Sequence, residues 1–206
     1  MSVVPGLQEH QAIRWDGVSE DTLAQSLVAP ARACIEAGLQ IDDGAGDANN
    51  GENRLSLTVS IQSIYRHAIA RVFLLEIGHR LALGQELRDR IHTALHEVLL
   101  NAVMHGHVQL EPGIRDSLGG FEASHEAIKR QLASEKCAHK RVVIEAQWNA
   151  ARLSIAVRDN GVGFDPNSSD AARHRGSGRG LLILDAFCDS VTYRNNGTVV
   201  ILGFEL

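Results

Sequence analysis

The stretch HEVLLNAVMHGH at residues 96–107 places a carboxylate, an amide and an imidazole four residues apart. If this stretch is helical, Glu97, Asn101 and His105 point in similar directions along the edge of an apolar stripe. Apolar residues flank Asn101 on both sides, so we expect its amide to be buried, and a buried amide without partners costs about 1–3 kcal/mol. From this spacing alone, Asn101 could simply bond a neighbouring backbone group while Glu97 is exposed.

A second stretch, RDNGVGFDP at 158–166, suits a flat, amine-bearing ligand. It ends an expected strand and holds Asp159, Gly161 and Gly163 in a D-x-G-x-G pattern. Glycine lets the backbone approach a flat ligand closely. An ionised aspartate is a pure acceptor, suited to an amino group such as the exocyclic amine of adenine. An ordinary Asp-Asn-Gly turn would also explain the stretch.

A third stretch, RHRGSGRGLLIL at 173–184, suits phosphate. Glycines that precede a helix expose backbone amides that can hold phosphate. The residues concerned are three glycines and three arginines, namely Gly176, Gly178, Gly180, Arg173, Arg175 and Arg179. A flexible loop with a solvated basic run is the alternative.

Hydrophobic periodicity predicts the elements that position these residues. Alternation indicates half-buried strands, and helical spacing indicates amphipathic helices. The predicted strands are 55–62, 141–148, 152–159 and 198–206, and the predicted helices are 63–83, about 86–105 and a segment after Gly180. The strands around the short turn at 149–151 should pair antiparallel. This order predicts an α+β fold, a two-layer sandwich with helices on one face of a mixed, mostly antiparallel sheet.

The composition of residues 41–53, IDDGAGDANNGEN, is typical of an exposed loop or linker. It predicts an N-terminal extension and linker over 1–53, with one or two short helices at 20–39, followed by a domain over 54–206. Within that domain, residues 108–140 form a long polar stretch between a predicted helix and the next predicted strand. Phe121, Ile128 and Leu132 predict one amphipathic helix there, which either contacts a partner or covers the core.

The bulk composition is that of a soluble protein, with 44% hydrophobic residues, 22% charged residues and a net charge of -5 over 206 residues. This balance gives no reason to expect a nucleic-acid or membrane partner, and no apolar run is long enough to span a bilayer. The 3 cysteines are widely spaced, which favours a reducing compartment and a cytoplasmic location.

The histidines of the first stretch raise a metal site as an alternative. His92 and His96 are four residues apart on the expected helix, and His105 and His107 follow. No third ligand is evident near either pair, and HEVLL is not the H-E-x-x-H pattern of zinc peptidases.

The order of these motifs is more specific than any one of them. E-x-x-x-N on a helix, D-x-G-x-G after a strand, a glycine loop before a helix and a final G-T-x-x-x-x-x-F strand follow one another. With these motifs, residues 55–206 resemble the ATP-binding domain shared by gyrase, heat-shock chaperones, histidine kinases and mismatch-repair ATPases. Within that superfamily the chain is most similar to small serine kinases that act as anti-sigma factors, through HEVLLNAVMHGH, VRDNGVGFDP and GRGLLILDAFCDSVTYRNNGTVVIL. Relative to those kinases, in which a short connection is expected, residues 108–140 would be an insertion.

The resemblance implies ATP and Mg²⁺ as cofactors. Asn101 would ligate the metal ion, and Glu97 would be the general base or would orient the nucleophile. Asp159 would accept from the adenine amine, and residues 165–180 would form a lid over the phosphates. The implied nucleotide-binding residues are Asn101, His105, Asp159, Gly161, Gly163, Gly176, Gly178, Arg179, Gly180 and Leu181.

Three functions are consistent with this resemblance. The first is a protein serine kinase that sequesters a sigma factor and is controlled by an anti-anti-sigma substrate; relatives often dimerise, so a homodimer is one state to test. The second is a histidine-kinase catalytic domain, which would need an upstream phosphoacceptor histidine in a context that His67 and His79 lack. The third is a binding module in which ATP only sets the lid, although such a module needs no carboxylate at Glu97.

Overall fold

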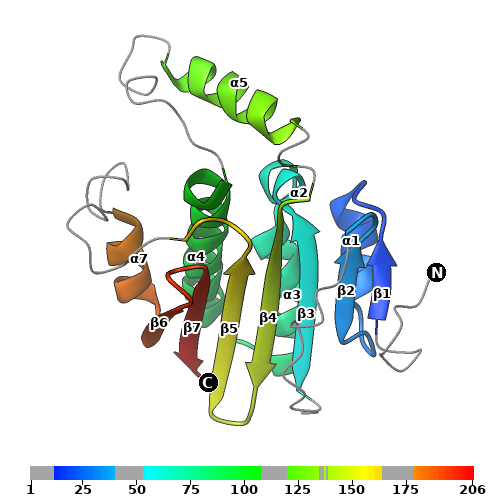
Figure 1. Cartoon of the computed structure of the whole chain (residues 1–206). Coiled ribbons are helices and arrows are strands. Elements are labelled where there is room, and N and C mark those ends of the chain that lie inside the picture. The colour runs from blue at the N-terminus through cyan, green and yellow to red at the C-terminus, as the bar shows by residue number, and fades with distance from the viewer. Residues whose placement is uncertain (1–11, 40–52, 108–119, 135–136, 138, 164–178) are drawn as a thin grey trace.

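The computed structural model describes residues 12–39, 53–107, 120–134, 137, 139–163 and 179–206 (Figure 1). Seven strands form one sheet in the order β1-β2-β3-β4-β5-β7-β6. The strands are β1 (Ala12–Trp15), β2 (Ala33–Glu36), β3 (Arg54–Ser60), β4 (Arg141–Trp148), β5 (Arg152–Asp159), β6 (Ser190–Arg194) and β7 (Val199–Glu205). The helices are α1 (Glu20–Leu27), α2 (Ile61–Arg66), α3 (Ile69–Leu81), α4 (Gln85–Asn101), the π-helix η1 (Ala102–His107), α5 (Gly120–Leu132) and α7 (Arg179–Phe187).

The predicted α+β architecture is confirmed. Strands β1, β2 and β3 pair in parallel, and the other neighbours pair antiparallel, so the sheet is mixed. Figure 1 shows α3 and α4 together behind the sheet. Alternate residues of the central strands point into this layer, and Leu57, Ile144 and Ile155 are fully buried there. The helices α3 and α4 therefore cover one face of the sheet, as the alternation of 55–62 and of the hairpin predicted.

Of the one or two short helices predicted for residues 20–39, one is present as α1, and Ala33–Glu36 forms strand β2 in place of a second. The run ACIE is too short to carry a period, and its pairing partner lies more than twenty residues away, with Cys34 opposite Leu57. The Glu36 carboxylate joins this segment to the next one, since it accepts from the Ser60 backbone N–H at 2.7 Å and from the Ser60 and Ser63 hydroxyls at 2.9 Å each. The predicted boundary near residue 54 therefore falls between two strands of one sheet.

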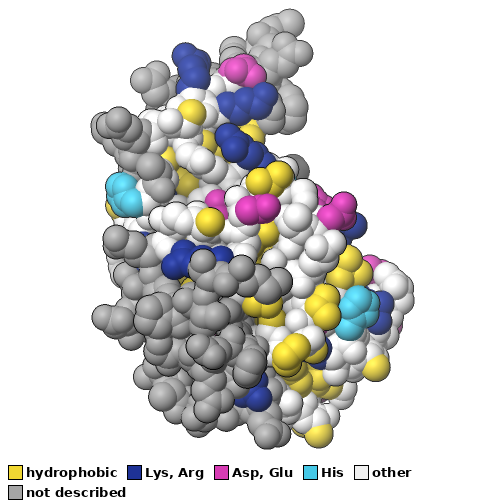
Figure 2. All heavy atoms as spheres, turned by 90° about the vertical axis from the view of Figure 1, so that its right-hand side faces the viewer, with side chains coloured by type: hydrophobic (Ala, Val, Ile, Leu, Met, Phe, Trp, Pro, Cys, Tyr) yellow, Lys and Arg dark blue, Asp and Glu magenta, His cyan; other side chains and the backbone are white. Residues whose placement is uncertain are grey.

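Helix α1 is fixed to α3 at both ends. The Glu20 carboxylate accepts from the Ala68 backbone N–H at 2.8 Å, at the start of α3. At the other end, the Arg80 guanidinium donates to the carbonyls of Leu27 at 2.7 Å and Ala31 at 2.9 Å. Each helix thus satisfies backbone groups that the other leaves unpaired at its terminus. Figure 2 views the molecule from this side and shows hydrophobic side chains mixed with charges of both signs.

The single helix predicted over residues 63–83 is two helices, α2 and α3, separated at His67 and Ala68. Ser60 caps α2 by accepting from the Ser63 N–H at 3.1 Å, which starts this helix directly at the end of β3. His67 is extended, with φ -122 and ψ 151. Neither proline nor glycine lies at the break, so the local sequence does not indicate it. The hydrogen bond from the Ala68 backbone N–H to Glu20 of α1 holds the chain at this point.

Two further features concern the C-terminal half. Strand β6 was not predicted; it is an edge strand joined to β7 by a turn in which Asn195, Asn196 and Gly197 all have positive φ. The helix predicted inside 108–140 is confirmed as α5, and its residues Ile128 and Leu132 are buried in the main core. This part of the insertion therefore covers core; the side chain of Phe121 lies outside the described residues. None of the described helices combines the length and apolar character needed to cross a membrane.

Candidate functional site

Glu97 and Asn101 form a hydrogen-bonded pair at the end of α4. The Asn101 side-chain Nδ2 donates to the Glu97 Oε1 at 3.1 Å, and both residues are half-buried. This contact is what i, i+4 spacing on an α-helix predicts. The hydrogen bond uses the amide nitrogen, so the amide oxygen is the atom of Asn101 that remains to accept from a ligand or to bind a cation.

The helical spacing changes immediately after this pair. Asn101 is the last residue of α4, and the chain continues as the π-helix η1 from Ala102 to His107. Four-residue α-helical spacing therefore does not extend from Asn101 to His105, and the His105 side chain lies outside the described residues. Short π-helical segments recur at functional sites, which agrees with the position of this one.

The first turn of α7 stands directly against the Glu97–Asn101 pair. A Cβ placed on Gly180 would overlap Glu97 Oε1 and would lie 3.3 Å from Asn101 Nδ2. Glycine lets the first turn of α7 lie this close to the pair, whereas a Cβ here would push the Glu97 carboxylate aside. Leu181 follows in the same turn and is half-buried. Two motifs about eighty residues apart in the sequence thus meet at one carboxylate.

The opposite end of α7 is anchored to α4 by Arg90. Its Nε donates to the Phe187 carbonyl at 3.1 Å, and its Nη2 lies 2.7 Å from the Asp189 carboxylate. The Glu205 backbone N–H also donates to Asp189, at 2.7 Å. These hydrogen bonds lower the pKa of the Asp189 carboxyl. The sequence analysis did not identify Arg90 or Asp189, since nothing local in the sequence connects position 90 with position 189.

Asp159 is the last residue of β5 and is half-buried. Its Oδ1 accepts from the Gly161 backbone N–H at 2.7 Å, so the ordinary Asp-Asn-Gly turn considered above is present. Burial raises the pKa of the Asp159 carboxyl, and the Gly161 hydrogen bond lowers it to a smaller extent. The turn holds one carboxylate oxygen in a fixed position, which also orients the second oxygen. The turn and an acceptor role for adenine are therefore compatible.

Gly163 has a positive φ of +73 and packs closely on the β6–β7 turn. A Cβ there would overlap the Asn196 backbone oxygen and would lie 3.0 Å from the Thr198 Cγ2 atom. The sequence analysis attributed this glycine to the approach of a flat ligand. In the structure, the Asn196 backbone oxygen leaves no room for a side chain at Gly163, even without a ligand.

Several predicted site residues lie outside the described part of the chain. These are Gly176, Gly178 and the predicted lid up to residue 178. Arg179 is the first residue of α7, and its side chain is likewise outside the described part.

The amide oxygen of Asn101 suits Mg²⁺. It is a hard ligand, and Mg²⁺ is usually held by one or two protein oxygens together with substrate phosphates and water. No cluster of three or more His, Cys, Asp or Glu side chains that could hold a metal occurs among the described residues. His92 and His96 stack with ring centroids 5.9 Å apart, without completing such a cluster.

Comparison with known families agrees with this geometry. Residues 122–204 match the family model of the histidine kinase-like ATPase domain. This part of the chain is therefore similar to histidine kinase-like ATPase domains, which bind ATP. The match begins within α5 and includes Asp159, Gly163 and Gly180, whereas Glu97 and Asn101 precede it. Among curated proteins, no significant match is found.

Proposed function

We propose that this chain is an ATP-dependent protein serine kinase of a bacterial partner-switching system. It transfers the γ-phosphoryl group of ATP to a serine of an anti-anti-sigma protein, and it sequesters a sigma factor. The observation that supports a kinase is the half-buried Glu97 carboxylate, hydrogen-bonded by Asn101 and placed against the first turn of α7. The matching family of ATPase domains includes anti-sigma factor kinases.

Each residue of the site has a distinct role in this proposal. Asp159 accepts from the adenine amine, because its carboxylate is half-buried and held in place by Gly161. The Asn101 amide oxygen would hold Mg²⁺, while its amide nitrogen donates to Glu97. Bound Mg-ATP supplies the phosphoryl group and a metal charge that offsets the phosphate oxygens.

Glu97 takes the proton of the attacking serine. As the serine oxygen bonds to the γ-phosphorus, the bond from phosphorus to the bridging oxygen breaks and ADP leaves. The hydroxyl proton then passes to the Glu97 carboxylate. A base of this kind contributes about 10²–10⁴-fold to a rate. Among the described residues Glu97 accepts one side-chain hydrogen bond, so acceptor capacity remains for this proton.

The test is label transfer from γ-labelled ATP to a partner protein that co-purifies with the chain. An acid-stable label on the partner indicates phosphoserine and supports the proposal. An acid-labile, base-stable label indicates phosphohistidine and would replace it with histidine-kinase chemistry. Nucleotide-dependent partner binding without any labelled protein would replace it with a binding module controlled by ATP.

A matched pair of variants makes the test specific to the site. Glu97→Gln keeps the size and polarity of the side chain but removes the base. Glu86→Gln changes an exposed glutamate in the first turn of the same helix. The proposal requires that Glu97→Gln transfers label much more slowly than Glu86→Gln, while both bind Mg-ATP.

A further inference from the structure

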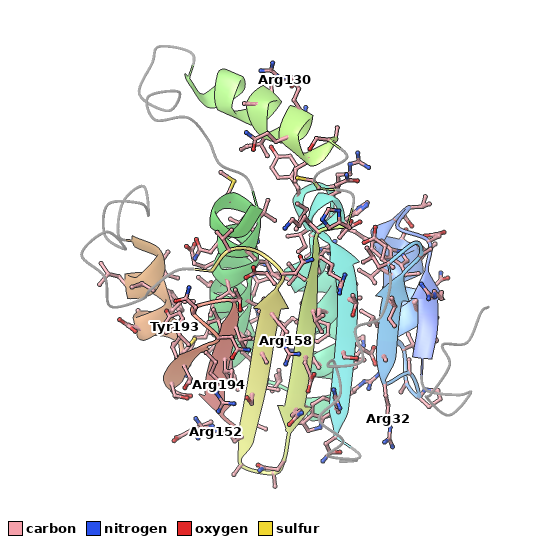
Figure 3. All side chains as sticks on the ribbon, viewed as in Figure 1. Arg32, Arg130, Arg152, Arg158, Tyr193 and Arg194 are labelled. Atoms are coloured by element: carbon pink, nitrogen blue, oxygen red, sulfur yellow. The ribbon has the colours of Figure 1, made fainter. Side chains whose placement is uncertain are left out.

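The sheet face opposite α3 and α4 carries a group of arginines on its last three strands. Arg152 and Arg158 belong to β5 and Arg194 to β6, and all three are exposed. Figure 3 shows these three labelled residues on the β5 and β6 part of the sheet. Small and apolar residues of the same face lie between them; we call the whole set the arginine face, with a floor of Ser154, Ala156, Val199, Ile201 and Gly203.

Strand register places Arg158 and Arg194 on either side of one floor residue. Val199 of β7 is paired with Arg158 of β5 and with Arg194 of β6. Directly paired residues share a face, and two strand spacings separate the arginine Cα atoms by roughly 10 Å. Val199 is only 5% exposed, and it is not part of the main hydrophobic core. The aliphatic stems of long basic side chains are suited to covering such apolar surface.

Arg152 lies across the floor at the other end of the arginine face. Its Nη2 donates to the Ser190 Oγ at 2.6 Å, so the side chain spans β7 from β5 to β6. A Cβ on Gly203 would lie 2.6 Å from the same nitrogen, which shows that the guanidinium rests on this glycine. Among the β5, β6 and β7 residues of this face, Glu205, paired with Arg152, is the one carboxylate. Two nearby carboxylates already have arginine partners: Asp189 is bound by Arg90 and Glu145 of β4 by Arg54.

We propose that the arginine face binds an acidic segment of a protein partner. The chain as a whole is acidic, with 25 Asp and Glu against 20 Lys and Arg, so a local excess of arginine marks a surface of opposite sign. Guanidinium groups above a small apolar floor fit carboxylate side chains projecting from an extended or helical segment. A sheet face that binds single-stranded nucleic acid typically presents aromatic side chains for stacking. The arginine face has no aromatic side chain among its β5, β6 and β7 residues, because the neighbouring Tyr193 points to the opposite face of the sheet and packs against the core.

This surface is separate from the nucleotide site, yet it shares a strand with it. Arg158 and Asp159 are consecutive at the end of β5, so they point to opposite faces of the sheet. Binding of an acidic partner therefore does not require the phosphoryl-transfer residues. A chain that fails to bind an acidic segment here could still be a kinase, and the reverse also holds.

The experiment measures anisotropy of a fluorescein-labelled poly-glutamate peptide titrated with the full chain. The variants are Arg158→Gln with Arg194→Gln, and separately Arg152→Gln. The matched control is Arg130→Gln, an exposed arginine on α5. We expect the double variant to bind the peptide roughly 10-fold more weakly, since two exposed charge contacts of ~0.7 kcal/mol each are lost. The Arg130 control should stay within about 2-fold, and added salt should weaken binding by the wild-type chain.

A labelled oligo-dT of similar length provides the nucleic-acid comparison. Equal peptide affinities for the double variant and the Arg130 control would overturn the proposal, and so would tighter binding of oligo-dT than of the peptide. Circular dichroism and Mg-ATP binding of each variant, unchanged from wild type, show that a loss of peptide binding reflects the arginine face and not misfolding.

Discussion

Two glutamates of this chain have similar settings but different hydrogen bonding. Glu36 lies beside the N-terminus of α2, and Glu97 lies near the end of α4. A glycine backbone approaches each carboxylate: a Cβ on Gly17 would lie 3.2 Å from Glu36 Oε1, and a Cβ on Gly180 would overlap Glu97 Oε1. Glu36 nevertheless accepts three hydrogen bonds of 2.7–2.9 Å, whereas Glu97 accepts one, at 3.1 Å, among the described residues.

The difference separates a structural carboxylate from one suited to chemistry. The bonds to Glu36 come from Ser60 and Ser63, so this side chain joins β2, β3 and α2 and has little capacity left for a ligand. Within the described part of the chain Glu97 has most of its acceptor sites left over, and a proton acceptor in phosphoryl transfer needs such sites. Burial of a glutamate or closeness to a glycine therefore does not identify a catalytic group, whereas the state of its hydrogen bonding is informative.

The largest predicted effect is on catalysis. Glu97→Ala should lower phosphoryl transfer by roughly 10²–10⁴-fold, the usual contribution of a positioned base, and should leave Mg-ATP affinity largely intact. Initial rates with γ-labelled ATP and a co-purified partner measure the first quantity, and calorimetry measures the second. Glu86→Ala, on the same helix, should transfer label at the wild-type rate. Transfer by Glu97→Ala as fast as wild type would remove Glu97 from the mechanism.

The second prediction concerns stability. Glu36→Ala should lower the free energy of unfolding by about 3 kcal/mol, because it leaves the Ser60 N–H and two buried hydroxyls without their acceptor. Urea unfolding followed by circular dichroism measures this change. The control, Glu126→Ala, removes an exposed glutamate of α5 and should cost less than about 1 kcal/mol. Equal midpoints for the two variants would mean that Glu36 is not the structural carboxylate described above.

Asp159 is the acceptor proposed for the adenine amine, and its Oδ1 is held by the Gly161 backbone N–H. Asp159→Asn should weaken adenine-nucleotide binding by roughly 10–100-fold, because an amide NH₂ can face the amine of the base where an acceptor is needed. Competition with a fluorescent nucleotide measures the affinity. An unchanged affinity would show that the adenine is bound elsewhere.

The pKa of Asp159 adds a pH signature to this variant. Burial raises the pKa of its carboxyl, and only the ionised form is a pure acceptor. Nucleotide affinity of the wild-type chain should therefore fall as the pH drops through this raised pKa, starting above the ordinary aspartate value of about 3.9. In Asp159→Asn that loss should be absent.

The smallest predicted effect belongs to Asn101. Asn101→Ala removes one of several oxygens around Mg²⁺, so Mg-ATP affinity should fall by roughly 10-fold and should depend less on the magnesium concentration. Titrations with ATP at a series of magnesium concentrations compare the variant with wild type. If both lose affinity to the same extent when magnesium is withdrawn, Asn101 does not bind the metal ion.

Local patterns predicted the elements that local interactions determine. The i, i+4 spacing of Glu97 and Asn101 predicted their contact, and alternation predicted the β4–β5 hairpin. Strand β2 and the break between α2 and α3 depend instead on distant contacts, namely the pairing of β2 with β3 and the Glu20 hydrogen bond to Ala68. The approach of Gly180 to Glu97 likewise depends on a contact between residues that are far apart in the sequence. The sequence could suggest that both motifs serve one nucleotide, but the contact itself depends on how α4 and α7 pack.

The most direct test of this account is a calorimetric titration of the full wild-type chain with Mg-ATP and Mg-ADP, accompanied by a thermal-shift measurement. We predict saturable heat and a raised unfolding temperature with both nucleotides, because a ligand that binds only the folded state stabilises it. No heat and no shift at saturating Mg-ATP and Mg-ADP would contradict the assignment of Glu97, Asn101 and Asp159 to a nucleotide site.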